Sequence, residues 1–390
     1  MNKEKLRLFF DRACAVSLYI LLFFIPISSA AIEIFFGFAL LFFLARLFVS
    51  GGFYLQLLKN EKIVVFFFIT LAFSLVNSGI FLPISLHALI FKWGRYIILY
   101  WVTAHTLIST PRIKYAIASI SIGATLVILD CYSQLLFGFE FLRHRSMVLH
   151  ANNILAITGP FAHNNGLAAY LICVLVIILY WIFSKSTMGI KYTAGTFFFL
   201  GIVILSRAYS RGAWISFIIA ILLLAILLKK FKFLGLSLLA IIILGVRFSV
   251  LKFLILKDSG RFELWDISFR MIKDHPLLGN GIGTFMALFR NFSLSRDISY
   301  AHNCFLQIWA EAGLIAVIIF IVFIVKIVKE GLLFYKKSND LICVILVCTI
   351  IAYLGGSFFD THLFSLQLAV LFWVLLGLLK GSIMSGVMQQ

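Results

Sequence analysis

The sequence predicts an all-α membrane protein that crosses the bilayer many times, and three observations carry this prediction. Of its 390 residues, 63% are hydrophobic and 12% are charged, whereas a soluble domain is about half apolar and about a quarter charged. Apolar runs of about twenty residues, each long enough to cross a bilayer as a helix, recur along the whole length. Alternating segments of about ten residues, which are typical of a membrane β-barrel, are absent from the sequence. We therefore expect a single transmembrane helical domain over 1–390.

About twelve transmembrane helices are predicted, one for each apolar run. The first run follows a basic start, and because hydrophobic runs simply continue after it, we interpret it as a membrane helix and not as a cleaved signal peptide. In chain order the predicted spans are 13–31, 33–49, 63–82, 90–108, 115–137, 164–183, 192–206, 212–228, 233–256, 304–325, 340–358 and 362–379.

The basic residues gather mainly in the connections that follow even-numbered spans. Cytoplasmic loops carry an excess of Lys and Arg, so this pattern places both termini in the cytoplasm. The net charge of +18 is therefore explained by topology, and its spacing argues against nucleic-acid binding. The connections in question contain Arg46, Lys59, Lys62, Arg112, Lys114, Lys185, Lys191, Lys229, Lys230, Lys232, Lys326, Lys329, Lys336 and Lys337.

The cations left on the outer side are mostly arginines, whose planar fork of donors suits phosphate and carboxylate groups. They are Arg143, Arg145, Arg207, Arg211, Arg261, Arg270, Arg290 and Arg296. Arg207 and Arg211 lie four residues apart at one junction of two spans, a spacing that would clamp a diphosphate if the junction were helical. Interfacial anchoring is the alternative for this pair.

One long polar segment, about 257–303, interrupts the hydrophobic sequence and is predicted to be a large outer loop. It begins with an amphipathic pattern after Arg261, in which Phe262, Trp265, Phe269 and Ile272 predict a helix that lies in the membrane interface. Pro276 ends that helix, and the glycines at 279, 281 and 283 predict a flexible loop. His302 closes the segment, where an imidazole can remove a proton from a hydroxyl nucleophile.

Other outer polar groups are candidates for substrate contacts. Arg143, Arg145, His163 and Asn164 lie in a second, shorter outer loop, where they would contact a substrate headgroup, although helix capping by Asn164 is an equal alternative. Arg95, at the edge of the fourth span, is a candidate phosphate contact.

Two further features complete the candidate set. Asp360 and His362, in the last outer turn, are candidates for orienting a partner. No metal or other cofactor is expected, because the outer side has no DxD, no carboxylate cluster and no His-x-x-x-His. The six cysteines lie in or beside apolar runs without CxxC spacing and are interpreted as small apolar residues.

Four segments, in this order, resemble the O-antigen ligase and polymerase superfamily of bacterial membrane glycosyltransferases. They are TGPFAHNNGLAAYL, SRGAW, GRFELW followed by PLLGNGIGTF, and AHNCFLQIWAEAGL. The resemblance implies a GT-C-type bundle in the inner membrane of a Gram-negative bacterium, with a periplasmic active site. It implies a glycan donor linked to undecaprenyl diphosphate and, for a ligase, a lipid A–core acceptor. It also implies a metal-independent, inverting reaction in which the essential histidine falls on His302 and the arginines fall on Arg211 and Arg261.

Among the functions that remain, the ligase is favoured because one long outer loop dominates and the second, at about 138–163, is only moderate. An O-antigen polymerase or a protein O-oligosaccharyltransferase of the same superfamily is the alternative. A transporter or anion channel is the third interpretation. It predicts inverted repeats and polar groups near mid-membrane, whereas this sequence has no clear internal repeat and gathers its polar residues at the outer surface.

Overall fold

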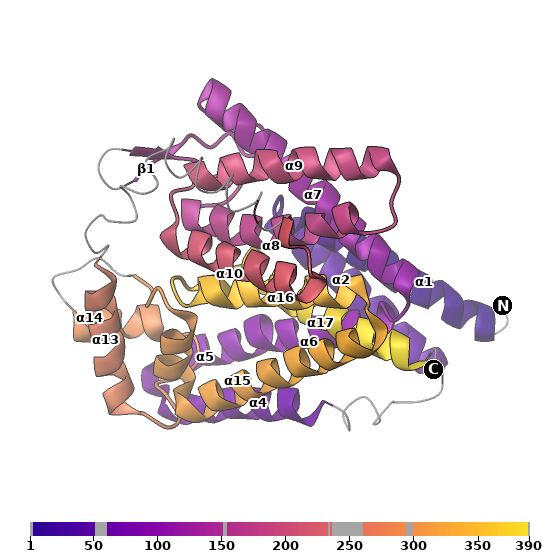
Figure 1. The fold of residues 1–390 in the computed structure, drawn as a ribbon. Helices are drawn as coiled ribbons and strands as arrows, with labels where there is room; N and C mark the ends of the chain where they lie inside the picture. The colour runs from indigo at the N-terminus through magenta and orange to yellow at the C-terminus, as the bar shows by residue number, and fades with distance from the viewer. Residues whose placement is uncertain are drawn as a thin grey trace.

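The computed structural model describes residues 3–50, 61–150, 154–232, 235, 260–293 and 299–388. These ranges fold as a bundle of α-helices (Figure 1). The long helices are α1 (Lys3–Phe24), α2 (Ser29–Val49), α7 (Thr110–Phe137), α8 (Asn164–Phe183), α9 (Met188–Arg207), α10 (Arg211–Leu228), α15 (Cys304–Ser338), α16 (Leu341–Ser357) and α17 (Leu366–Met388). The shorter ones are α4 (Lys62–Phe73), α5 (Leu82–His87), α6 (Arg95–Thr106), α13 (Arg261–Asp274) and α14 (Phe285–Phe292).

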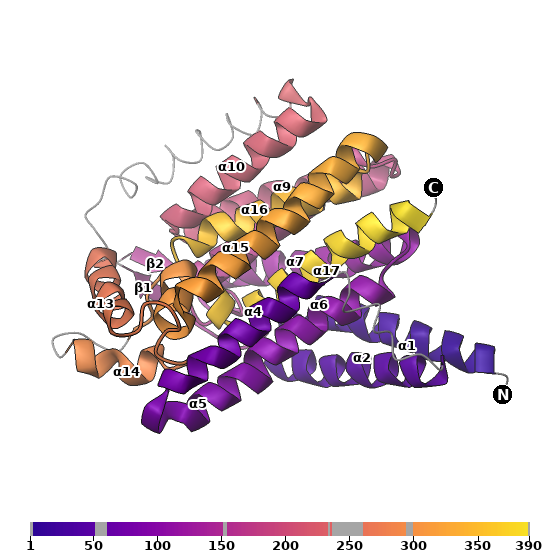
Figure 2. The same ribbon diagram turned by 90° about the horizontal axis from the view of Figure 1, so that it is seen from below.

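The bundle has two distinct ends. Both chain termini lie at one end, which we call the terminal end, while α13 and α14 lie at the other, the distal end (Figures 1 and 2). The helices α8, α16 and α17 form the most buried part of the core, whereas α2 lies at the periphery. The chain is thus a multi-pass membrane protein, and the described residues contain 7 helices that are long and apolar enough to be candidate spans.

Each predicted span except 233–256 overlaps an α-helix, and 233–256 lies outside the described residues apart from residue 235. The boundaries differ in informative ways. The predicted range 13–31 straddles a turn, because α1 ends at Phe24 and the Ser28 hydroxyl caps α2 by accepting from the Ala31 N–H at 3.2 Å. The apolar run 63–82 is not one α-helix: α4 gives way to the 3₁₀ turns η1 (Ser74–Asn77) and η2 (Gly79–Phe81).

Two further irregular elements were not predicted. A π-helical turn, η3 (Ala88–Gly94), opens the fourth predicted span ahead of α6. A small antiparallel pair of strands, β1 (Val148–His150) and β2 (Ile154–Ala156), forms in the second outer loop with Leu149 opposite Leu155. The six cysteines are free and buried, as the sequence predicts.

Ion pairs tie the helices together at the terminal end. Asp11 of α1 accepts from both Arg46 of α2 and Arg112 of α7. Lys380 of α17 contacts Glu61 at 3.2 Å and Glu330 at 3.1 Å. Some of the cations that serve the topology prediction therefore also hold the bundle together. Because such partly buried groups are costly to leave unpaired, each partner depends on the others.

The polar segment is not an open loop in its described parts, 260–293 and 299–303. Its first helix, α13, confirms the predicted amphipathic helix, but the buried face differs from the predicted stripe. Leu264, Ile267 and Met271 pack in a separate apolar cluster with Phe285 and Phe289 of α14. Phe262 and Phe269 instead point outward, with 68% and 44% of their surface exposed. Both faces of α13 are partly apolar, so periodicity alone did not identify the one that packs.

The glycine-rich stretch after α13 docks against a break in α15. Gly313 has φ 84° and ψ 172°, which interrupts the helix, and the exposed backbone groups are taken up by the loop. The Asn280 N–H donates to the Ala310 carbonyl at 3.0 Å, and the Leu314 N–H donates to the Pro276 carbonyl at 3.0 Å. The glycines therefore provide close backbone approach, and the predicted flexible loop is wrong for this stretch.

A buried carboxylate completes that junction. Glu311 of α15 accepts from the Gly283 N–H at 2.8 Å and from the Gln307 amide at 3.2 Å. On its other side the loop rests against η1 and α5, since the Ile282 N–H donates to the Ser74 hydroxyl at 3.0 Å. Loop 276–285 thus fixes α13 and α14 to the start of α15.

We expect Gly313→Ala to destabilise this junction strongly. A Cβ at residue 313 would lie 2.1 Å from the Leu277 carbonyl oxygen, and this backbone region costs a side chain about 1–3 kcal/mol even without a clash. Thermal unfolding in detergent should show a clear loss. Gly195→Ala is the matched control, because Gly195 lies in α9 with open space around its Cα. An unchanged midpoint for Gly313→Ala would contradict the account of the break.

Candidate functional site

The distal end contains a histidine–carboxylate pair formed by two segments that are far apart in the sequence. His302 precedes α15 and Asp360 follows α16. His302 Nδ1 lies 2.9 Å from Asp360 Oδ1, and about a third of the His302 side chain (32%) is exposed, against 17% for Asp360. Asn303, the next residue, caps α15 by accepting from the Phe305 and Leu306 N–H groups. His302 itself has φ 48°, a left-handed turn that projects it from the start of the helix.

Asp360 is held as a carboxylate. Burial opposes its ionisation, but the hydrogen bond from His302, the charges of His362 and His302 and the Thr361 N–H together keep its pKa well below its usual range. The Thr361 N–H donates to the same oxygen at 2.7 Å. An ionised Asp360 accepts a proton-bearing Nδ1, which leaves Nε2 of a neutral His302 as the acceptor.

His362 lies behind this pair and is buried. Burial lowers its pKa, the nearby Asp360 opposes that shift, and the charge of Arg261 adds to it. A Cβ at Gly356 would lie 2.7 Å from the His362 ring, so the imidazole is tightly packed against α16. Of the two residues predicted to orient a partner, Asp360 contacts His302, whereas His362 packs inside. Helix α13, which begins with Arg261, packs in one apolar cluster with Ala301, the residue before His302.

The junction of α9 and α10, which carries Arg207 and Arg211, meets the same turn. A Cβ at Gly212 would lie 2.4 Å from the Phe359 Cβ, so the start of α10 is in direct contact with the residue before Asp360. The Ile157 N–H donates to the Arg207 carbonyl at 3.2 Å. Arg207 ends α9 and Arg211 begins α10, so the two do not share one continuous helix. The structure thus gathers this junction, the Asp360 turn and His302 at the distal end.

Four of the five remaining predicted contact residues bind other groups of the protein. Arg143 donates to the Ile27 carbonyl at 2.6 Å, and Arg145 donates to the Pro160 carbonyl at 3.2 Å. Arg95 forms an ion pair with Glu33. Asn164 does not cap α8; its side-chain amide donates to the Ala208 carbonyl at 2.7 Å and braces the α9–α10 junction. His163 is the exposed residue before α8.

Another cation, Lys92, lies near the last turn and was not among the predicted site residues. Lys92 lies on the π-helical turn η3, and its ammonium stands 4.8 Å above the centre of the Phe364 ring. π-helical turns occur often at functional sites. The sequence feature that could have identified Lys92 is its charge within an apolar run, three residues before Arg95.

Comparison with known proteins adds a family. Residues 196–321 match the model of the Wzy_C family, which is described as O-antigen ligase. The matched range includes Arg207, Arg211, Arg261 and His302, and ends before Asp360. A search of curated proteins gives no match. Members of the Wzy_C family are membrane enzymes that transfer glycans from lipid-linked substrates. Residues 196–321 of the chain are therefore similar to the Wzy_C family, which O-antigen ligases and O-antigen polymerases share.

Proposed function

We propose that this protein is an O-antigen ligase. It transfers a glycan from undecaprenyl diphosphate to a sugar hydroxyl of lipid A–core, at the periplasmic face of a Gram-negative inner membrane. The observation that carries the proposal is the His302–Asp360 pair, 2.9 Å apart. The start of α10, which carries Arg211, contacts the turn of Asp360, and α13, which begins with Arg261, packs with Ala301 beside His302. The family match supports glycan transfer, and the location of the pair at the end opposite the termini supports a periplasmic site with cytoplasmic termini.

The proposed chemistry is a single displacement without a metal. His302 Nε2 takes the proton from the acceptor hydroxyl as its oxygen attacks the anomeric carbon. The bond from that carbon to the diphosphate breaks, and the diphosphate leaves with the electron pair, so the anomeric centre is inverted. Arg211 and Arg261 stabilise the charge that grows on the leaving group. Asp360 holds His302 in the required tautomer and stabilises the imidazolium that forms.

Arg207 and His163 are proposed to line the donor headgroup. Arg143, Arg145, Arg95 and Asn164 already donate to protein groups. We therefore propose that these four act on the substrate through the shape of the site that they brace.

Asp360→Asn should lower kcat by about 100-fold or more, because an amide cannot hold the Nδ1 proton of His302 as a carboxylate does. The change is nearly isosteric, so KM for the lipid donor should stay close to that of the wild type. Transfer by the purified protein, assayed across pH, gives the measurement. Asp266→Asn, on the exposed face of α13, is the control. Among the described residues, Asp266 forms an ion pair only with Arg270 of the same helix. Wild-type kcat for Asp360→Asn would contradict the role given to Asp360.

The acceptor distinguishes the ligase from its alternatives. Purified protein should transfer glycan from the lipid diphosphate to complete lipid A–core and fail with a core-deficient lipid A. Elongation of the lipid-linked glycan without lipid A–core would identify a polymerase. Transfer to a protein hydroxyl would identify an O-oligosaccharyltransferase. Either result would overturn the ligase assignment. The roles of His302 and Asp360 would still be tested by the same variants, assayed with the acceptor that is then identified.

A further inference from the structure

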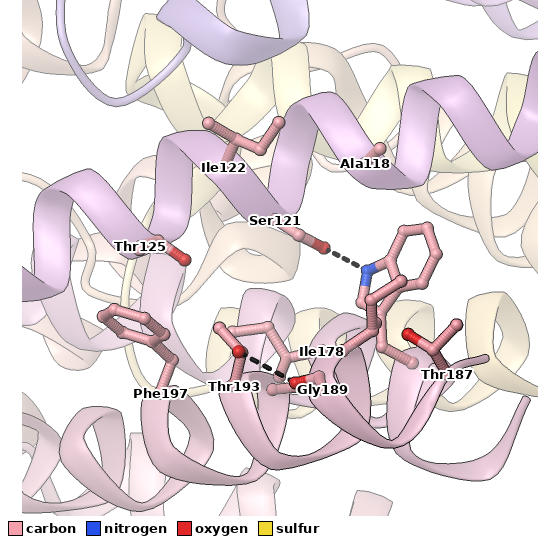
Figure 3. Close-up of a pocket in the computed structure, with 12 residues that line it drawn as sticks. Ala118, Ser121, Ile122, Thr125, Ile178, Thr187, Gly189, Thr193 and Phe197 are labelled. Atoms are coloured by element: carbon pink, nitrogen blue, oxygen red, sulfur yellow. Dashed lines mark hydrogen bonds between the residues drawn. The ribbon is translucent and has the colours of Figure 1, made fainter.

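A groove of about 550 Å³ lies between α7, α8 and α9, away from the site described above. Figure 3 shows its lining, in which Ser121 and Thr125 of α7 lie across the space from Thr193 of α9. Ile122 and Ile190 have 60% and 44% of their surface exposed, so the groove opens on the outside of the bundle. In a multi-pass membrane protein, that outside surface faces lipid.

Most of the polar side chains in the groove are hydrogen-bonded within the protein. The Trp181 indole N–H donates to the Ser121 hydroxyl at 2.9 Å, and the Thr193 hydroxyl donates to the Gly189 carbonyl at 2.9 Å (Figure 3). The first bond ties α8 to α7, and both bonds satisfy groups that would otherwise attract a polar ligand. The remaining surface is mostly apolar, which suits a hydrocarbon chain.

The groove lies at the terminal end. Its lining includes Thr187 and Gly189 in and after the α8–α9 connection. The other end of α8 begins at Asn164, which binds Ala208 beside the candidate site. A helix of 20 residues is about 30 Å long, so the groove is roughly a membrane core away from that site. A lipid with its phosphate at this end therefore belongs to the leaflet opposite the proposed donor.

Three lysines lie on the segments that form the opening. Lys191 lies four residues after Thr187 and Lys114 lies four residues before Ala118, so each shares a helix face with a lining residue. Lys185 lies in the connection between α8 and α9. Among the described residues, none of the three ammonium groups has a hydrogen bond or an ion pair. Lysines beside an apolar groove between spans attract an anionic lipid headgroup.

We propose that this groove binds an anionic glycerophospholipid, with one acyl chain between α7 and α9 and the phosphate at Lys185 and Lys191. The apolar lining selects the chain, and the lysines select the charge. The site is independent of the proposed glycan transfer, because its residues lie outside the His302–Asp360 cluster.

The test measures lipid binding to the full-length protein in detergent by native mass spectrometry. Phosphatidylglycerol and phosphatidylcholine with identical acyl chains are the two probes. The wild type should bind phosphatidylglycerol more tightly. The double variant Lys185→Gln, Lys191→Gln should weaken that binding roughly 25-fold, about fivefold for each lysine, and should leave phosphatidylcholine unchanged. The control is Lys329→Gln with Lys336→Gln, two exposed lysines of α15, which should have no effect.

A second variant tests the groove itself. Thr193→Trp should fill the space and reduce binding of both lipids, whereas Ile215→Trp, on the exposed face of α10 (42% exposed), should not. Size-exclusion chromatography and the thermal midpoint establish that each variant is folded. Equal affinity of the wild type for the two lipids, or unchanged binding by either groove variant, would overturn the proposal. Undecaprenyl phosphate that displaces phosphatidylglycerol at lower concentration would also overturn it, because the groove would then be a site for an isoprenoid.

Discussion

His302→Ala should reduce glycan transfer by about 10²- to 10⁴-fold, the range that a general base contributes. The side chain is partly exposed and contacts Asp360 and Ser299. It belongs to neither apolar cluster, so its removal leaves the core intact. The loss should appear in kcat, since the proton is transferred in the reaction itself. The measurement is transfer by purified protein from a lipid-diphosphate donor under single-turnover conditions.

The matched control for His302 is His275→Ala. His275 is exposed at the end of α13, in the same polar segment, and should tolerate the change. His302→Gln refines the test, because a glutamine at this position keeps hydrogen-bonding capacity but cannot accept the proton. Near-wild-type transfer by His302→Ala would exclude this histidine as the base and would leave the distal site without an assigned nucleophile activator.

Much of this architecture could be predicted, because its physical causes are local in the sequence. Apolar runs predict helices wherever they occur, and the amphipathic pattern after Arg261 predicted α13 to within a residue of its start. The face of α13 could not be predicted in the same way. Leu264 and Phe262 are both apolar, and only the partners on α14 and α15 decide which one is buried.

The residues of the site were predicted one by one, but the contacts between them depend on tertiary structure and could not be predicted. His302 and Asp360 are 58 residues apart, so no spacing rule connects them. The contact arises because α15 and α16 pack side by side, and α15 begins at the distal end where α16 ends. The glycines at 279 and 313 illustrate the same limit. Gly279 was predicted to be a source of flexibility, and nothing in the sequence marked Gly313, yet each proves necessary because another backbone lies against its Cα.

Arg95 and Glu33 show how context changes the meaning of a charge. The sequence places Arg95 at the edge of a span as a candidate phosphate contact and assigns no partner to it. In the fold Arg95 and Glu33 form an ion pair. A cation within an apolar run is thus compatible with a phosphate contact or with a structural pair, and only the partner distinguishes them.

Arg211→Ala and Arg261→Ala should each lower transfer by about 10²- to 10³-fold, the cost of removing one group that stabilises the charge of a transition state. Arg→Lys variants should recover only part of the activity, because lysine keeps the charge but loses the planar pair of donors. If both arginines contact one diphosphate, their effects should be less than additive in the double variant. Arg270→Ala is the control, since Arg270 is exposed on α13 and pairs with Asp266 one turn away. Additive effects would instead indicate separate targets, one on the donor and one on the acceptor. Wild-type transfer by either single variant would remove that arginine from the proposed site.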